Sequence, residues 1–193
     1  QKVKPLKVYN APSPQKNVKA DYPAKASRRK HDGWVIVDVD INETGAVDQV
    51  HIKESYGAKA FIEAAETAVK QWQYKPKNKP SKQFVSNVKV DFNKSAKGSV
   101  GSSFGRKYKK IKQLIDNNKQ EQALKALQKI SLHRLEKTQE INLALSLWSM
   151  YGHKTNDKAL QLHYLSKMNL NKRRDDENYM FSILKQKLIL QLN

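Results

Sequence analysis

The stretch GWVIVDVDINETGAVDQVHI, residues 33–52, decides the fold of the first half of the chain. Its first part alternates as a strand with two unlike faces does, because successive side chains of a strand point to opposite sides. One face carries Val35, Val37, Val39 and Ile41, and the other carries Trp34, Ile36, Asp38 and Asp40. Asn42 and Gly45 are typical of a tight turn, since Asn opens such turns and Gly adopts a positive φ. The stretch therefore predicts a β-hairpin whose second strand runs from Val47 to Ile52.

The residues that follow predict a bulge, one helix and a third strand. The odd step between Val47 and Val50 indicates an irregularity in the second strand, since an even step would keep both side chains on one face. A stripe at helical spacing then comprises Phe61, Ala64, Ala65, Ala68, Val69 and Trp72. We expect this helix to end in WQYKP, residues 72–76, where proline forbids continuation. A last strand from Phe84 to Phe92 completes a small α+β fold, a three-stranded antiparallel sheet with one packed helix.

Composition limits the classes of partner and chemistry. The 193 residues include 37 Lys and Arg against 18 Asp and Glu, a formal charge of +19, which favours anionic partners such as an envelope polymer. Lys outnumbers Arg, the better bidentate reader of bases, so no specific nucleic-acid partner is expected. The chain has no cysteine, which excludes disulfides and thiolate sites. No apolar run approaches the roughly 18–20 residues that cross a bilayer.

The chain divides into four segments by composition. Residues 1–19 are a Pro- and Lys-containing extended spacer, residues 20–93 hold the α+β fold, and residues 94–105 are a Gly/Ser-rich linker. Residues 106–193 carry helical stripes throughout. Within them EQAL at 121–124 and DKAL at 157–160 lie 36 residues apart, which resembles a tetratricopeptide-like array of paired helices. A chance likeness within an ordinary helical domain is the alternative.

We expect no enzyme, and neither a cofactor nor a metal site. The five histidines show no metal-ligand spacing and no carboxylate partner in the sequence. Asp38 and Asp40 are interpreted as the solvent face of a half-buried strand. The segment GSSFGRK, residues 101–107, has the wrong glycine spacing for a phosphate-binding loop and is interpreted as linker.

Residues 20 to 92 resemble the C-terminal domain of TonB, the periplasmic protein that engages outer-membrane transporters in Gram-negative bacteria. The resemblance rests on the order and spacing of several short motifs. These motifs are YPAKA at 22–26, GWVIV at 33–37, NETGAV at 42–47, VHI at 50–52 and the helix end WQYKP at 72–76.

The resemblance implies binding without catalysis. In the family a short extended receptor segment, the TonB box, adds as a strand beside the last strand of the domain, so that main-chain hydrogen bonds give affinity. The residues expected to contact it here are Tyr22, Pro23, Phe84, Val85, Ser86, Asn87, Val88, Lys89, Val90, Asp91 and Phe92. The alternative is an ordinary edge strand that Lys82 and Lys89 protect from pairing.

The resemblance also implies a periplasmic location and a role in energy-coupled transport. The expected partners are a TonB-dependent outer-membrane receptor and an ExbB–ExbD type motor, with a second, unidentified envelope partner for the helical half. Because the sequence starts at Gln1 rather than Met, we expect either a removed signal peptide or a trimmed inner-membrane anchor. The alternatives are an envelope scaffold without receptor binding and a basic nucleic-acid-binding protein.

Overall fold

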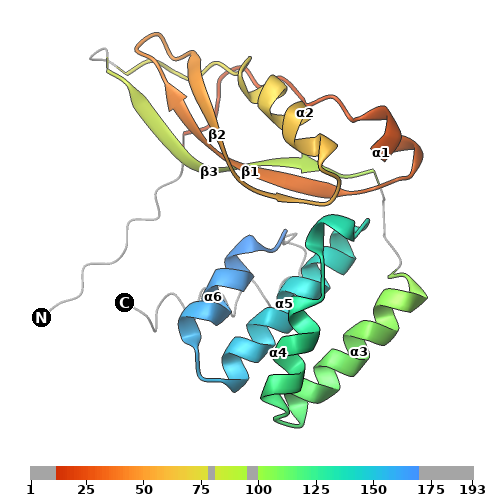
Figure 1. Ribbon diagram of the computed structural model, residues 1–193. Helices are drawn as coiled ribbons and strands as arrows, with labels where there is room; N and C mark the ends of the chain where they lie inside the picture. Colours follow the sequence, from red (N-terminus) through yellow and green to blue (C-terminus); the bar gives the residue numbers. More distant parts are fainter. Residues whose placement is uncertain (1–11, 78–80, 95–99, 170–193) are drawn as a thin grey trace, which may run out of the picture. The chain divides into compact units, whose positions relative to one another are not determined.

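The computed structural model describes residues 12–77, 81–94 and 100–169 (Figure 1). The chain forms two compact units, residues 1–96 and 97–193. Most of the predicted spacer, the middle of the predicted linker and the predicted helical stripe beyond residue 169 lie outside the described residues. None of the helices in the described part is long and apolar enough to span a membrane.

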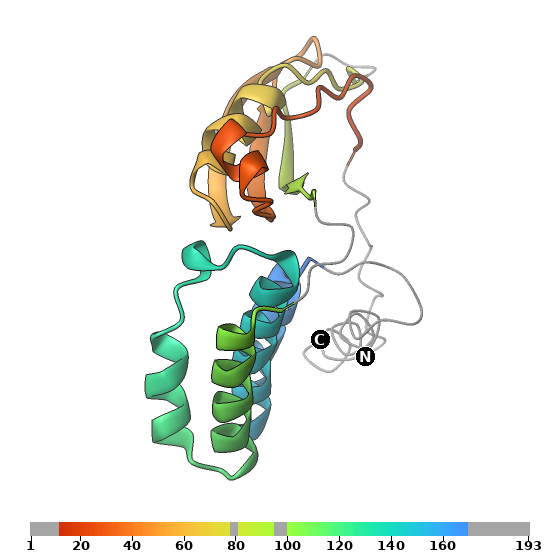
Figure 2. The ribbon, with the colours of Figure 1, turned by 90° about the vertical axis from the view of Figure 1, so that its right-hand side faces the viewer.

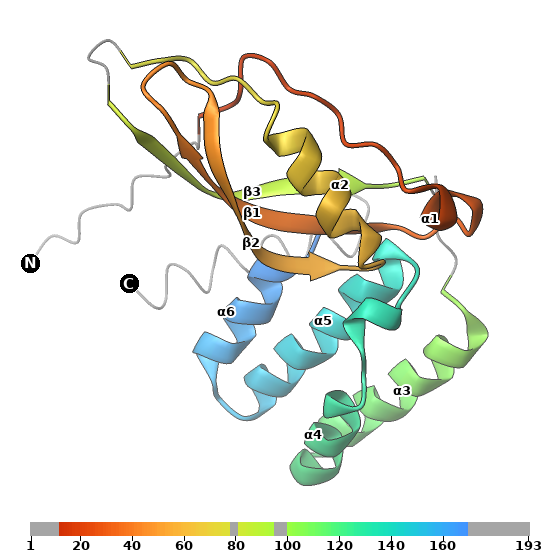
Figure 3. The same ribbon diagram turned by 45° about the horizontal axis from the view of Figure 1, so that its top comes forward.

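The first unit has the predicted α+β fold. Its strands are β1 (Gly33–Ile41), β2 (Val47–Tyr56) and β3 (Gln83–Phe92), and they form an antiparallel sheet in the order β2-β1-β3. Helix α2 (Ala60–Val69) crosses one face of this sheet (Figure 3). Because β1 has a neighbour on each side, β2 and β3 are the two edge strands of the described sheet.

The core of this unit lies between α2 and the apolar face of β1. Val35, Val37, Val39 and Ile41 are buried, which confirms the alternation predicted for this strand. Helix α2 and strand β3 add further buried side chains to this core, namely Phe61, Ala65, Val69, Val85, Val90 and Phe92. Burial of one such large apolar side chain contributes about 1.5–3 kcal/mol. The alternation of β1 therefore fixes which face of the sheet receives the helix.

The hairpin turn and the predicted bulge are both present. Gly45 has a φ of +87°, and its N–H donates to the Asn42 carbonyl at 3.0 Å. The Asn42 side-chain oxygen accepts from the Thr44 and Ala46 N–H groups, both at 3.0 Å. Ile41 pairs with Val47 whereas Asp40 pairs with Gln49, so one extra residue lies between the two pairs. This residue absorbs the odd step between Val47 and Val50.

Three boundaries differ from the predicted ones. Strand β2 continues to Tyr56, four residues beyond the expected end, and a short helix α1 (Ala24–Arg28) was not predicted. Helix α2 ends at Val69, before the WQYKP motif. The physical reason is that Gln73 pairs in extended conformation with Lys16, with N–H···O distances of 3.0 Å in both directions. The N-terminal segment thus takes hydrogen bonds that a longer helix would have used.

The second unit is helical in its described part, as expected. It comprises α3 (Ser102–Asp116), α4 (Gln120–Gln128), the 3₁₀ turn η1 (Leu132–Arg134), α5 (Thr138–Lys154) and α6 (Lys158–Lys167). Helix α5 contacts α3, α4 and α6. Figure 2 shows α3 and α4 as an antiparallel hairpin, in green. Helix α3 begins four residues inside the predicted linker, because Phe104 is buried and the Gly101 N–H donates to Glu140 at 2.8 Å.

The two helical hairpins α3–α4 and α5–α6 share one turn geometry. Asn118 and Asn156 both have a φ of +56°. The backbone N–H of each donates to the carbonyl of the residue three positions earlier. The equivalent buried pairs are then Ala123 with Gln161 and Leu127 with Leu165, 38 residues apart. The match of EQAL at 121–124 with DKAL at 157–160, which are 36 residues apart, is therefore wrong by two positions. It sets the buried Ala123 against the exposed Ala159. The tetratricopeptide likeness stays a prediction.

Substitution of Gly45 by alanine should destabilise the first unit by at least about 2 kcal/mol, because a strained backbone there costs about 1–3 kcal/mol and crowding adds to it. A Cβ at this position would lie 2.1 Å from the Tyr74 carbonyl oxygen. Glu43→Ala in the same turn is the control and should change stability by no more than about 0.5 kcal/mol. Urea denaturation, followed by NMR signals of β1, measures both. Equal stability of the two variants would contradict the requirement for glycine.

Candidate functional site

Strand β3, the expected docking strand, lies at the edge of the sheet. It pairs with β1 along one side, and the described residues place no strand along its other side. An edge of this kind presents unpaired backbone N–H and C=O groups, which are the template for strand addition. Val85, Val90 and Phe92 point into the core, whereas Ser86, Lys89 and Asp91 are exposed. Among the described residues, Phe84 is the most exposed large apolar side chain, at 60%.

A bulge at Asn87 interrupts this edge, although the sequence predicted an unbroken strand. Val37 pairs with Val88 and Val39 with Val85, so two residues of β3 lie opposite Asp38. Asn87 has a φ of +58°, a left-handed conformation that Asn adopts more readily than most residues. The bulge divides β3 into residues 83–86 and residues 88–92.

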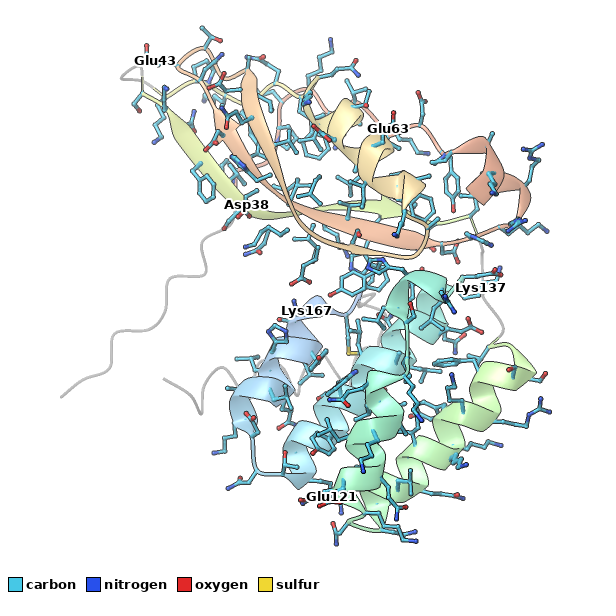
Figure 4. The ribbon with its side chains drawn as sticks, in the orientation of Figure 1. Asp38, Glu43, Glu63, Glu121, Lys137 and Lys167 are labelled. Carbon is cyan, nitrogen blue, oxygen red and sulfur yellow. The ribbon has the colours of Figure 1, made fainter. Side chains whose placement is uncertain are left out.

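Polar contacts from the two other strands hold the bulge. The Asn87 N–H donates to Asp38 Oδ1 at 2.8 Å, and Lys53 Nζ donates to Asn87 Oδ1 at 3.1 Å. Lys53 Nζ also lies 3.4 Å from Asp38 Oδ2. Asp38 belongs to the central strand and Lys53 to the opposite edge, so one cluster of three side chains spans the whole sheet. Figure 4 shows Asp38 on the face of the sheet away from α2. Glu63, which is also labelled there, belongs to α2 itself.

The structure brings Tyr22 to the far end of β3. Its ring makes edge-to-face contacts with Phe61 and Phe92, with centroids 5.5 and 5.8 Å apart. The phenol donates a hydrogen bond to the His31 carbonyl oxygen, and Lys94 Nζ lies 5.2 Å from the ring centroid. Burial, with a smaller contribution from the Asp32 carboxylate, raises the pKa of Tyr22 to about 12. Tyr22 thus joins the N-terminal segment to residues 88–92.

Pro23, the neighbouring predicted contact, lies elsewhere. It lines a groove of about 410 Å³ between the segment around residues 18–23 and the outer face of α2. The Trp72 indole N–H donates to the Val18 carbonyl at 2.8 Å and holds this segment against the end of the helix. The structure therefore places Tyr22 with the β3 edge and Pro23 with the α2 groove.

The solvent face of the sheet contains a pair that sequence reasoning missed. His51 Nε2 lies 2.7 Å from Asp40 Oδ2, and both side chains are about half exposed. The pair is diagonal, since Asp40 is opposite Gln49 and His51 is opposite Asp38. Without the strand register nothing in the sequence indicates it. Within the described residues no three His, Cys, Asp or Glu side chains gather closely enough to hold a metal ion.

Comparison with known proteins confirms the family resemblance for the first unit. Residues 18–94 match the family described as Gram-negative bacterial TonB protein C-terminal, so this segment is similar to a TonB C-terminal domain. The match ends before α3, and the helical region is not identified as a tetratricopeptide array.

Two curated relatives and one solved structure are similar to part of the chain. Protein tonB2 of Pseudomonas aeruginosa is 34% identical over 79 residues, which are 39% of this chain and 29% of that protein. Protein TonB of Escherichia coli is 33% identical over 72 residues, 37% of this chain and 30% of that protein. The chain thus spans less than a third of the length of these relatives. The solution NMR structure of the Pseudomonas aeruginosa TonB C-terminal domain aligns with 22% identity and a TM-score of 0.38, covering 47% of this chain and 92% of that one.

Asn87→Val should destabilise the first unit by about 1–2 kcal/mol, because a β-branched residue is strained in the left-handed region. Asn87→Gly is the matched control. It accepts the same φ, loses the contact with Lys53 and should cost no more than about 0.5 kcal/mol. Urea denaturation followed by NMR signals of β1 compares the two. If the valine variant is as stable as the glycine variant, the bulge is not a fixed feature of the edge.

The contribution of Tyr22 to stability should disappear at alkaline pH. Folding raises the pKa of this phenol from about 10 to about 12, so the native state favours the neutral form. The stabilisation is complete below about pH 10 and is lost as the pH rises towards about 12. At about pH 8, Tyr22→Phe should therefore be less stable than the wild type by about 0.5–1.5 kcal/mol, the worth of its hydrogen bond. Urea midpoints of the wild type and of Tyr22→Phe at about pH 8 and at about pH 12 check this. A stability difference between the two proteins that is larger at the higher pH would contradict it.

Proposed function

We propose that residues 18–94 bind an extended segment of a TonB-dependent outer-membrane receptor by strand addition to β3, in energy-coupled transport across the envelope. The observation that carries the proposal is the edge position of β3 in a domain that matches the TonB C-terminal family. Backbone groups of an edge strand recognise an extended peptide by main-chain hydrogen bonds, each contributing about 0.5–1.5 kcal/mol net. No catalytic step is part of this function.

Residues 88–92 are the half of β3 that we propose as the docking ladder. The bulge at Asn87 ends the regular ladder on one side, while the pairs from Val88 to Phe92 follow β1 without interruption. Tyr22 packs against Phe92 at the end of this half. Lys89 and Asp91 form an exposed ion pair, 3.6 Å apart, on the face opposite α2. Side chains of a docked segment would lie beside these two residues and meet charges of both signs.

The rest of the machinery is proposed on the same basis. A strand-addition domain exerts force only if the chain is coupled to an energised membrane partner, for which an ExbB–ExbD type motor is the proposed source. We place the protein in the periplasm, and we assign the helical unit to a second envelope protein. The repeated helical hairpin supports this assignment, because stacked helix pairs commonly form extended binding surfaces.

An envelope scaffold without receptor binding is the second candidate, and one observation favours it. A bulge and a lysine on an edge strand are devices by which proteins prevent strand pairing, and β3 carries both, at Asn87 and Lys89. In a scaffold the same edge would be closed to any added strand. The two candidates therefore make opposite predictions for a peptide offered to β3.

Disulfide trapping on the full chain separates the candidates, because the native sequence contains no cysteine. Lys89→Cys and Asp91→Cys place thiols beside the proposed ladder. Peptides tiled across the N-terminal segments of the receptors encoded in the same genome, each with one added cysteine, are the probes. We expect one peptide region to trap at Lys89→Cys and Asp91→Cys several times more than at Phe84→Cys, which lies beyond the bulge.

Two exposed positions serve as controls in the same experiment. Gln49→Cys lies on β2, the opposite edge, and Glu63→Cys lies on the α2 groove. Trapping that is strongest at Gln49→Cys or Glu63→Cys would refute docking on β3. Trapping that is equally weak at every position, with peptides from all receptors, would support the scaffold.

A further inference from the structure

We infer that the outward face of helix α3 binds the phosphate headgroups of an anionic lipid bilayer. Five cations lie within seven residues of this helix, namely Arg106, Lys107, Lys109, Lys110 and Lys112. Four of the five are exposed and Lys112 is half-buried. The inference does not rest on strand addition, because α3 lies outside the matched domain and its charges are independent of the β3 edge.

The cations share the side of α3 that faces away from its core. Phe104, Ile111 and Ile115 form the buried stripe of the helix. Arg106, Lys109 and Lys110 are spaced i, i+3 and i+4, so they project from one face, and Lys107 and Lys112 flank them. The exposed positions at either end of this face are the uncharged Ser102, Ser103 and Gln113, together with Asp116, which pairs with Lys112. The result is a single cationic face on a helix whose apolar side is already packed.

Four of these five charges take no part in the ion pairs of the described residues. Lys112 pairs with Asp116 at 2.6 Å. This hydrogen bond is the largest of the effects that raise the pKa of Lys112. The other four cations have no ion pair with any described residue. The carboxylate of Glu140, which reaches the start of α3 from α5, accepts from the Gly101 N–H instead. An external anion is therefore the partner that these side chains lack.

The arrangement also works against the helix itself. Arg106 and Lys110, like Lys107 and Lys110, are like charges at helical neighbour spacing, which repel. The first turn of α3 contains no acidic residue, so cations follow directly on the positive end of the helix dipole. A surface of negative headgroups would remove both penalties.

Among the described helices of this unit, the positive charge is concentrated in α3 and α4. Residues 102–128, which span α3 and α4, contain seven Lys or Arg and two Asp or Glu. Residues 138–167, which span α5 and α6, contain three Lys or Arg and two Asp or Glu. Of the two described hairpins, α3–α4 therefore carries the cationic surface.

A bilayer fits this face better than a nucleic acid does. Clusters of four to eight Lys or Arg on a helix are typical of anionic-lipid binding, with each cation contributing about fivefold in affinity. Lysine supplies four of the five charges, and the exposed positions of α3 include no aromatic ring on which a base would stack. Because the apolar stripe is buried in the unit, the contact is electrostatic adsorption without insertion.

Vesicle sedimentation of the full chain tests the inference. The variant Arg106→Gln/Lys109→Gln/Lys110→Gln removes the centre of the face, and Lys59→Gln/Lys154→Gln/Lys158→Gln removes the same charge from exposed positions elsewhere. On phosphatidylglycerol-containing vesicles in about 0.1 M salt, we expect about 100-fold weaker partitioning for the α3 variant. The control variant should lose about fivefold or less. In about 1 M salt, where the Debye length is only about 3 Å, wild-type binding should vanish.

The same samples report whether the cations are structural. Thermal unfolding of the α3 variant should be unchanged or shifted upward, because repulsion is removed and glutamine favours helices. Equal losses in the two variants, or equal binding to phosphatidylcholine vesicles, would overturn the inference. So would a lower unfolding midpoint for the α3 variant. Tighter binding to a DNA duplex than to vesicles at matched phosphate concentration, lost in the α3 variant, would assign the face to nucleic acid instead.

Discussion

The alternation of β1 is the constraint on which the first unit depends. Its valines must all face α2, and both neighbouring strands must follow the register that this sets. Where the sequence of a neighbour does not alternate in step, an extra residue restores the phase, after Val47 in β2 and at Asn87 in β3. The central strand has no free side, so the edges available to a partner are those of β2 and β3.

The bulge at Asn87 divides the β3 edge into two parts, of which residues 88–92 keep a regular pairing with β1. Asp38 accepts the Asn87 N–H while Lys53 holds its side chain, so a rigid break divides the edge. Residues 88–92 keep a regular ladder and end beside Tyr22, which ties the N-terminal segment to Phe92. We propose strand addition for residues 88–92, on one side of the bulge that interrupts the edge at Asn87. The helical unit adds a separate cationic face on α3.

Sequence patterns predicted the features that local chemistry determines. The strand faces, the Asn42–Gly45 turn and the bulge after Val47 follow from alternation and from glycine, and the structure contains all of them. The break at Asn87 was missed because it appears only once Val85 and Val88 are set against β1. The early end of α2 depends on Lys16, and the His51–Asp40 pair on strand register. Pairings between distant residues are what a single sequence does not contain.

The central claim is that an extended segment docks on residues 88–92 of β3. Amide hydrogen exchange of the full chain, with and without the receptor peptide that traps most strongly, tests it most directly. The account predicts slower exchange within residues 88–92, with residues 47–56 of β2 unchanged, since amides that join a new ladder lose access to water. Slower exchange along β2 or in α2, with residues 88–92 unaffected, would contradict it.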